Sequence, residues 1–325
     1  MHNDLTYWLL NSEPWTAYRT RIDIMGQAGI DPEVVAARKK MTSHPAIVAL
    51  LSEFGSWPGS ILTSHKSAGH PIHKLSFAAD LGLNVSDESI HTVCSKIFRH
   101  ISEEGPFQVM MNIPVHFGGS GMDEYAWALC DAPIIVYCLE KFGMGENPEV
   151  LRAKEYLLGL CRENGYPCTA SKELGKFRGP GRKGDPCPYA SMIMLKIMSL
   201  YEKDRNSDFA RNTVLSLLDL WEKSREHHPY MFFMGNDFRK LKAPLIWYDI
   251  LHLADTLSHF NFAVKDARFG EIMDIIENKS GMDGKYVPES VWKAWKGWDF
   301  GQKKQPSSWL TFLVYRLRKR LRESC

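Results

Sequence analysis

One short phrase recurs along this chain and limits what the chain can fold into. An acidic residue, a glycine and an aromatic residue stand together at five points, spaced about 50 to 70 residues apart. The five phrases are Glu53-Phe-Gly-Ser-Trp57, Glu104-Gly-Pro-Phe107, Glu163-Asn-Gly-Tyr166, a weaker Gly235-Asn-Asp-Phe238, and Asp283-Gly-Lys-Tyr286. A period of that length is typical of one helical hairpin per repeat. The sequence therefore predicts an array of helix–turn–helix units.

Proline marks the start of the apolar helix that follows several of these turns. Asp131-Ala-Pro133, Asp185-Pro-Cys-Pro188 and Lys242-Ala-Pro244 each precede a long apolar segment, and proline is tolerated in a first helical turn. These segments are apolar over most of their circumference, whereas the intervening helical patterns are one-sided. We therefore expect an inner ring of buried helices and an outer ring. No segment alternates strictly between apolar and polar residues, so little β-structure is expected.

The repeats leave no obvious linker between domains. We predict one all-α domain over residues 1–325, with a helical extension at 1–45 and the hairpin repeats at 46–320. Acidic or serine starts and glycine stops predict two helices before Gly55, over residues 12–26 and 31–55.

Charge and cysteine usage narrow the functional class. The net charge is only +2, which gives no support to nucleic-acid binding. The cysteines number seven and lie mostly in helical patterns, so they do not form an evident disulfide framework and a reducing compartment fits best. No apolar run is long enough to span a membrane, and the N-terminus has no signal-peptide pattern. We expect a cytoplasmic protein, with the basic segment 315–322 offering peripheral contact with a membrane surface.

The hairpin period, the glycine turns, the Pro-started helices and the late phrase Pro306-Ser-Ser-Trp-Leu-Thr311 resemble one superfamily. It contains the squalene and terpene cyclases and the protein prenyltransferase β-subunits, and the resemblance covers roughly residues 46–320. The resemblance implies an α/α toroid of about five to six hairpins around an aromatic-lined cavity. It also implies a transferase or cyclase acting on a hydrophobic, isoprenoid-like small molecule, and either a homodimer or a helical partner subunit.

The same resemblance points to a zinc site. The chain lacks the Asp-x-Asp-Asp and Asp-Asp-x-x-Asp motifs of terpene cyclases, but protein prenyltransferases hold zinc through an Asp-x-Cys pair and a later histidine. Asp185 and Cys187 match the pair, and Asp249 or His252 offers the third ligand. Three ligands and an open position suit catalytic zinc, with Cys187 and Asp249 as candidate catalytic residues. In the alternative interpretation, Asp185 caps the helix and Cys187 packs as a small apolar residue.

Three further groups of residues are candidates for substrate contact. The basic loop residues Arg178, Arg182 and Lys183 suit an anion such as diphosphate or a carboxylate, although a solvated surface loop is an equal alternative. Aromatic side chains near the inner helices would shelter a cationic intermediate or simply belong to the core. These aromatic residues are Trp127, Tyr137, Tyr189, Trp247 and Tyr248.

Histidines supply the last candidates. His65, His70 and His73 lie within nine residues, and we favour structural or substrate-contacting roles for them over metal binding. His116 lies in a Gly-rich loop and is a candidate acid or base, or a histidine that only bonds the backbone. Two rival functions follow: a noncatalytic toroid that binds a ligand or partner, and a non-isoprenoid enzyme that uses these histidines.

Overall fold

Helices make up most of the described chain. A computed structural model describes residues 3–177, 184–224, 237–247 and 249–323. In that part of the chain the only strands are β1 (Val109–Met111) and β2 (Glu124–Ala126), which pair antiparallel with Met110 opposite Tyr125. The described residues therefore confirm the predicted class, which is mostly helical with little β-structure.

The chain divides into two compact units. Unit 1 contains residues 1–52 and 236–325, and unit 2 contains residues 53–235. The helices of unit 1 are α1 (Asn3–Leu10), α2 (Pro14–Arg19), η1 (Thr20–Ile24), α3 (Pro32–Thr42), α4 (Pro45–Ser52), η6 (Asp237–Arg239), α12 (Ile250–Leu257), α13 (Asn261–Val264), α14 (Ala267–Glu277), η7 (Lys293–Trp295) and α15 (Ser308–Glu323). The helices of unit 2 are η2 (Glu53–Ser56), α5 (Pro71–Asp80), α6 (Glu88–Ile97), η3 (Val115–Phe117), α7 (Ala132–Leu139), η4 (Glu140–Met144), α8 (Pro148–Leu158), η5 (Lys172–Leu174), α9 (Pro188–Met198), α10 (Glu202–Arg205) and α11 (Asp208–Glu222).

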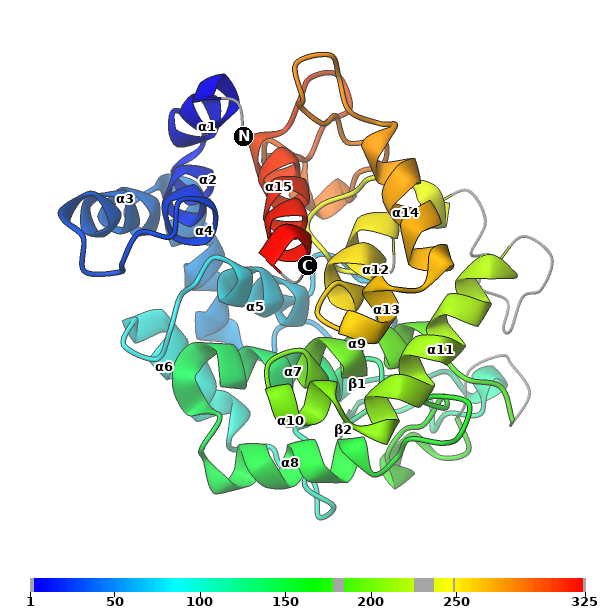
Figure 1. Cartoon of the computed structure of the whole chain (residues 1–325). Coiled ribbons are helices and arrows are strands. Elements are labelled where there is room, and N and C mark those ends of the chain that lie inside the picture. The colour runs from blue at the N-terminus through cyan, green and yellow to red at the C-terminus, as the bar shows by residue number, and fades with distance from the viewer. Residues whose placement is uncertain (1–2, 178–183, 225–236, 248, 324–325) are drawn as a thin grey trace. The chain divides into compact units, whose positions relative to one another are not determined.

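In unit 2, three buried helices lie side by side. Helix α7 packs between α5 and α9, with α8 against α7 and α11 against α9 (Figure 1). Every residue of α7 and of α9 is buried, whereas α8 and α11 bury one face only. The difference between apolar and one-sided helical patterns therefore corresponds to a difference in burial, as the sequence predicts.

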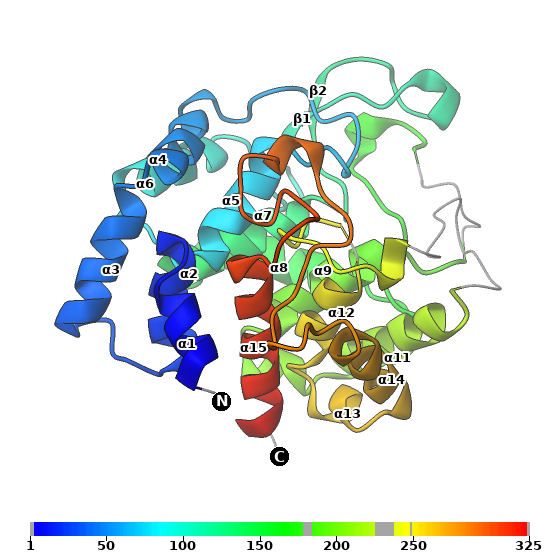
Figure 2. The same cartoon turned by 90° about the horizontal axis from the view of Figure 1, so that it is seen from above.

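In unit 1, α12 lies between α14 and α15 (Figure 2). All eight residues of α12 are buried, and α15 also packs against α2 and η1 from the N-terminal part of the chain. Because α15 packs against these N-terminal helices, unit 1 contains residues from both ends of the chain.

The turn around Gly165 ties α8 to α9. Gly165 has φ +97°, and a Cβ atom there would lie 3.0 Å from Ser216 Oγ, so only glycine fits without strain. The next residue, Tyr166, is fully buried and donates its backbone N–H to Ser191 Oγ in α9. The Tyr166 carbonyl then accepts the backbone N–H of Cys187 at the start of α9.

The turn around Gly284 repeats this arrangement between α14 and α15. Gly284 has φ +77°, and the buried Tyr286 donates its backbone N–H to Thr311 Oγ1. The Tyr286 carbonyl accepts the backbone N–H of Ser307. Two of the predicted repeats therefore share hydrogen bonds as well as sequence, and the buried tyrosine of the turn anchors the next helix in both.

Two predicted boundaries are wrong. The predicted helix start at Pro244 is wrong, since α12 begins at Ile250. The Asp249 carboxylate caps that start by accepting the N–H groups of Leu251 and His252. Apolar composition alone does not separate a buried loop from a buried helix. The region before Gly55 holds more than two helices, since residues 31–55 are interrupted before Pro45 and α1 precedes α2.

Within the described residues, no helix combines the length and the apolar character that crossing a membrane requires.

Candidate metal-binding site

A carboxylate with one unpartnered oxygen lies at the start of α7. Asp131 occupies the N-cap position but makes no capping hydrogen bond with its side chain. The residue is only 3 % exposed, and its Oδ1 atom has no hydrogen-bond partner in the described part of the chain. An unsatisfied buried oxygen is costly, and a bound cation is one group that would satisfy it.

Two further ligand-type side chains meet Asp131. His65, from the loop before α5, and Cys130 offer ligand atoms that lie with an Asp131 oxygen within 4.8 Å of one another. The His65 ring stacks on Tyr189 of α9 at a centroid distance of 5.7 Å. Cys130 is buried, and His65 is partly exposed. All of these residues belong to unit 2.

Burial sets the protonation of the group. Burial raises the pKa of Asp131 to about 7, with partial opposition from a hydrogen bond with Cys130. Burial, followed by the charges of Asp131, Cys168 and Cys187, raises the pKa of the Cys130 thiol well above its usual range. Burial lowers the pKa of His65 to about 4, so its imidazole is neutral at pH 7. Neutral histidine is the form that binds metal, whereas the thiol must lose its proton on binding.

The donor set fits zinc. Zn²⁺ binds imidazole nitrogen, thiolate sulfur and carboxylate oxygen, and catalytic sites hold it with three protein ligands and an open position. His65, Cys130 and Asp131 supply one donor of each kind. The unpartnered Oδ1 of Asp131 leaves the group one carboxylate oxygen that a cation would satisfy.

The predicted Asp185 and Cys187 pair has a different local role. Cys187 is the N-cap of α9, and its sulfur accepts the Ala190 N–H at 3.5 Å. It is 6 % exposed, and burial raises its pKa to about 12. Asp185 is partly exposed and is not the cap of α9, which corrects the alternative interpretation of that residue.

The predicted third ligands, Asp249 and His252, belong to unit 1. Both are almost fully buried at the start of α12. Burial raises the pKa of Asp249 to about 7, its Oδ1 caps the helix, and its Oδ2 has no hydrogen-bond partner among the described residues. His252 Nδ1 bonds the Trp247 carbonyl at 2.9 Å. The role of this pair in zinc binding stays a prediction.

The other predicted histidines take three separate positions. His70 caps α5 through Nδ1 and bonds the Ser60 carbonyl through Nε2, and burial lowers its pKa. His73 is 1 % exposed and bonds the His65 carbonyl through Nε2, so it supports the loop that carries His65. His116 is exposed in η3, against Phe117.

Aromatic candidates are mostly core residues. Trp127, Tyr137 and Tyr189 are buried in unit 2, and Tyr137 donates its hydroxyl to Asp80 Oδ1. Trp247, in unit 1, is partly exposed. The remaining predicted substrate-contacting residues lie outside the described residues: Arg178, Arg182, Lys183 and Tyr248.

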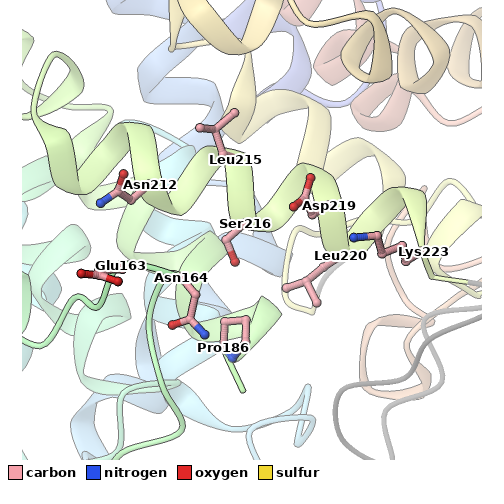
Figure 3. A pocket seen from close by; sticks show the side chains of 9 residues that line it. All are labelled: Glu163, Asn164, Pro186, Asn212, Leu215, Ser216, Asp219, Leu220 and Lys223. Atoms are coloured by element: carbon pink, nitrogen blue, oxygen red, sulfur yellow. The ribbon is translucent and has the colours of Figure 1, made fainter. Parts of the chain in front are cut away.

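A pocket of about 380 Å³ opens beside the turn that leads to α9. Figure 3 shows Asn164 and Pro186 facing the side of α11 that carries Ser216. No aromatic side chain lines this pocket, so it differs from the aromatic-lined cavity that the resemblance implies. The lining residues are Glu163, Asn164, Pro186, Asn212, Leu215, Ser216, Asp219, Leu220 and Lys223.

Comparisons with known proteins leave the family open. No protein-family model matches the sequence, and no curated protein matches it. A solved structure described as a protein from Actinoplanes is 12% identical, with a TM-score of 0.42, and the match covers 96% of this chain and 90% of that chain.

Sequence reasoning overlooked Cys130 and Asp131 as ligands, although a signal was present. Cys130-Asp131-Ala-Pro133 combines a cysteine, an aspartate and a proline at a helix start, as Asp185-Pro-Cys-Pro188 does. Only the second phrase has the Asp-x-Cys order of the resembled family. His65, which is 65 residues upstream of Cys130, could be joined to the pair only by the fold.

Proposed function

We propose that this protein is a zinc-dependent enzyme of the prenyltransferase type, with zinc held by His65, Cys130 and Asp131. The observation that carries the proposal is the convergence of three different donor atoms within 4.8 Å, one of them on a buried carboxylate whose Oδ1 is unpartnered. The resemblance implies the same three residue types: an Asp and a Cys at the start of a buried helix, and a His from another part of the chain. Here the Cys and the Asp come from the start of α7 instead of α9, and the His comes from the loop before α5.

The arrangement of helices supports the proposal in a second way. Unit 2 has buried helices with one-sided helices against them, and two glycine turns of the chain share one hydrogen-bond pattern. Both features suit the α/α toroid of that superfamily, which we propose as the complete architecture. A hydrophobic, isoprenoid-like molecule remains the proposed substrate, because the resemblance is what suggests it.

Each proposed ligand has a defined contribution. The neutral imidazole of His65 donates a lone pair without losing a proton, while Cys130 and Asp131 bring negative charge once deprotonated. Tyr189 stacks on the His65 ring and limits its rotation. Zinc with an open position would supply Lewis acidity toward a substrate thiol, a carbonyl or water.

The first experiment measures bound zinc in tag-free protein. We expect about one zinc per chain, lost in His65→Ala, Cys130→Ser and Asp131→Ala. Cys138→Ala is the matched control, because Cys138 is a buried cysteine of α7 outside the group. Zinc that is lost in Cys187→Ala and kept in Cys130→Ser would instead place the metal at the Asp185 and Cys187 pair.

Activity is tested separately, with an allylic diphosphate and a small thiol as acceptor. Thioether formation that needs zinc and Cys130 would support the transferase. Stoichiometric zinc without turnover of any allylic diphosphate would contradict it and favour the noncatalytic alternative. Cobalt substitution adds a structural readout, since the intensity of the thiolate-to-metal charge-transfer band reports how many cysteines are ligands.

A further inference from the structure

Two buried histidines bond to the loop that carries His65. This loop, residues 60–70, ends at His70, the N-cap of α5. His70 is 3 % exposed, and His73, in the first turn of α5, is 1 % exposed. Imidazole nitrogens buried to this degree need hydrogen-bond partners, and the loop supplies a backbone carbonyl to each of the two rings.

His70 ties the two ends of the loop together. Its Nδ1 atom accepts the Ile72 N–H at 3.2 Å, so in the neutral ring this nitrogen carries no proton. The Nε2 atom therefore carries the proton and donates it to the Ser60 carbonyl at 2.9 Å. One imidazole thus caps α5 and also holds the start of that helix against the chain 10 residues earlier.

His73 holds the middle of the loop. Its Nε2 atom lies 2.9 Å from the His65 carbonyl oxygen, which can only accept a hydrogen bond, so this nitrogen is also a donor. The bond fixes the backbone of the ligand residue itself. The loop turns on both sides of this bond: the Ser67 N–H donates to the Ser64 carbonyl, and the His70 N–H donates to the Ser67 carbonyl.

The position of this backbone decides where the His65 ring can lie. The ring stacks on Tyr189 of α9, and one of its nitrogens lies with ligand atoms of Cys130 and Asp131 within 4.8 Å of one another. Cys130 and Asp131 are adjacent in the sequence, whereas His65 comes from a separate segment. The set of three donors is therefore complete only while the loop holds His65 in this position.

We propose that His70 and His73 are positioning residues, whose ring hydrogen bonds fix the loop so that the His65 imidazole faces Cys130 and Asp131. The inference rests on the proposed function, because it is zinc binding that needs the ligand in this place. It also divides the roles within the histidine cluster of the sequence: His65 is a ligand, and the other two histidines hold its loop. Substituting groups that orient a metal ligand typically changes metal affinity by about 10–100-fold.

The zinc affinity of the full chain tests His73 first. Its dissociation constant is measured by competition with a chelator of known affinity. His73→Leu removes the hydrogen-bond donor and should weaken zinc binding by about 10–100-fold. His73→Gln keeps an N–H donor at the end of its side chain and should restore most of the affinity. An unchanged dissociation constant in His73→Leu would overturn the role of this residue.

His70→Asn separates the two hydrogen bonds of His70. Asparagine is a preferred N-cap residue, so its side chain still accepts the Ile72 N–H, but it is too short to reach the Ser60 carbonyl. Zinc affinity should therefore fall while circular dichroism shows that the fold is kept. Zinc affinity equal to that of the unsubstituted chain would show that the tie to Ser60 does not position the ligand, and would overturn the role of His70.

Ile90→Val is the matched control for a general loss of stability. Ile90 is a fully buried residue of α6 in the same unit, and shortening it destabilises the core without removing a hydrogen bond from the loop. It should lower the melting temperature and leave the zinc dissociation constant unchanged. A loss of zinc affinity as large as that of His73→Leu would show that destabilisation explains both, and would contradict the positioning role.

Amide hydrogen exchange of zinc-free protein separates this inference from the proposed function. The amides of Ser67 and His70 are hydrogen-bonded within the loop, so they should exchange faster in His73→Leu than in the unsubstituted chain. An unsubstituted chain that binds no zinc, together with this acceleration, contradicts the proposed function and supports the fixing of the loop. Zinc binding by the unsubstituted chain, with neither exchange nor affinity changed in the variants, contradicts the inference alone.

Discussion

Glu140 places a carboxyl group inside unit 2 next to two other charges. Lys154 Nζ lies 3.4 Å from Glu140 Oε1 and 2.6 Å from Asp204 Oδ2. Burial raises the pKa of Glu140 to about 7, because the attraction of Lys154 only partly offsets it. One lysine therefore faces two carboxylates, and its attraction does not fully offset the burial of Glu140.

This raised pKa predicts a pH-dependent stability. The folded pKa exceeds the unfolded value of 4.5, so the contribution of Glu140 is fully present below about pH 4.5 and is lost as pH rises through about 7. Across this pH range the free energy of unfolding should fall by roughly 2–3 kcal/mol because of Glu140. Glu140→Gln should remove that fall. Urea unfolding between pH 4.5 and 8 measures it. The exposed Glu149→Gln is the control, and an unchanged slope in Glu140→Gln would refute the explanation.

Asp131 and Asp249 show how one residue type serves two purposes. Both occupy the N-cap position of a buried helix, and burial raises the pKa of both to about 7. Asp249 Oδ1 accepts two backbone N–H groups, which is the ordinary role of an N-cap aspartate. Asp131 makes no such bond and leaves its Oδ1 without a partner among the described residues, so the helix lacks a side-chain cap there.

At the scale of elements, the glycine turn and the helix that follows it act together. Gly165→Ala should lower the free energy of unfolding by about 1–3 kcal/mol, because a non-glycine residue at φ +97° is strained and its Cβ would meet Ser216 Oγ. Thermal or urea unfolding measures the change. Gly159→Ala is the matched control, since Gly159 ends α8 with φ −64° and offers ordinary contact distances. Equal effects of the two substitutions would show that the turn conformation is unimportant.

The elements also show how far the sequence can predict this structure. Glycine turns and apolar helices follow from local chemistry, so the turn at Gly165 and helix α9 agree with their predictions. The start of α12 was missed because the apolar run after Pro244 has no local mark that separates loop from helix. The candidate metal-binding group was missed for another reason: His65 and Asp131 meet only when α5 and α7 pack together.

At the scale of the whole molecule, the chain forms two compact units, and unit 1 draws on both chain ends. The sequence predicts a single toroid over residues 1–325, and that organisation stays a prediction. The division matters for function, because His65, Cys130 and Asp131 all lie in unit 2, whereas the alternative ligands Asp249 and His252 lie in unit 1.

Amide hydrogen exchange with and without zinc tests this assignment in the intact chain. A ligand at 100 times its Kd stabilises the state that binds it by about 2.7 kcal/mol, so amides that exchange by opening of that site slow about 100-fold. We expect slowing in the segments that carry the ligands, around His65 and from Trp127 to Ala132, and no change in α12. Cys130→Ser should show no slowing anywhere. Slowing confined to α12 would move the metal to Asp249 and His252, while equal slowing in both units would show that they open as one cooperative domain, as the toroid requires.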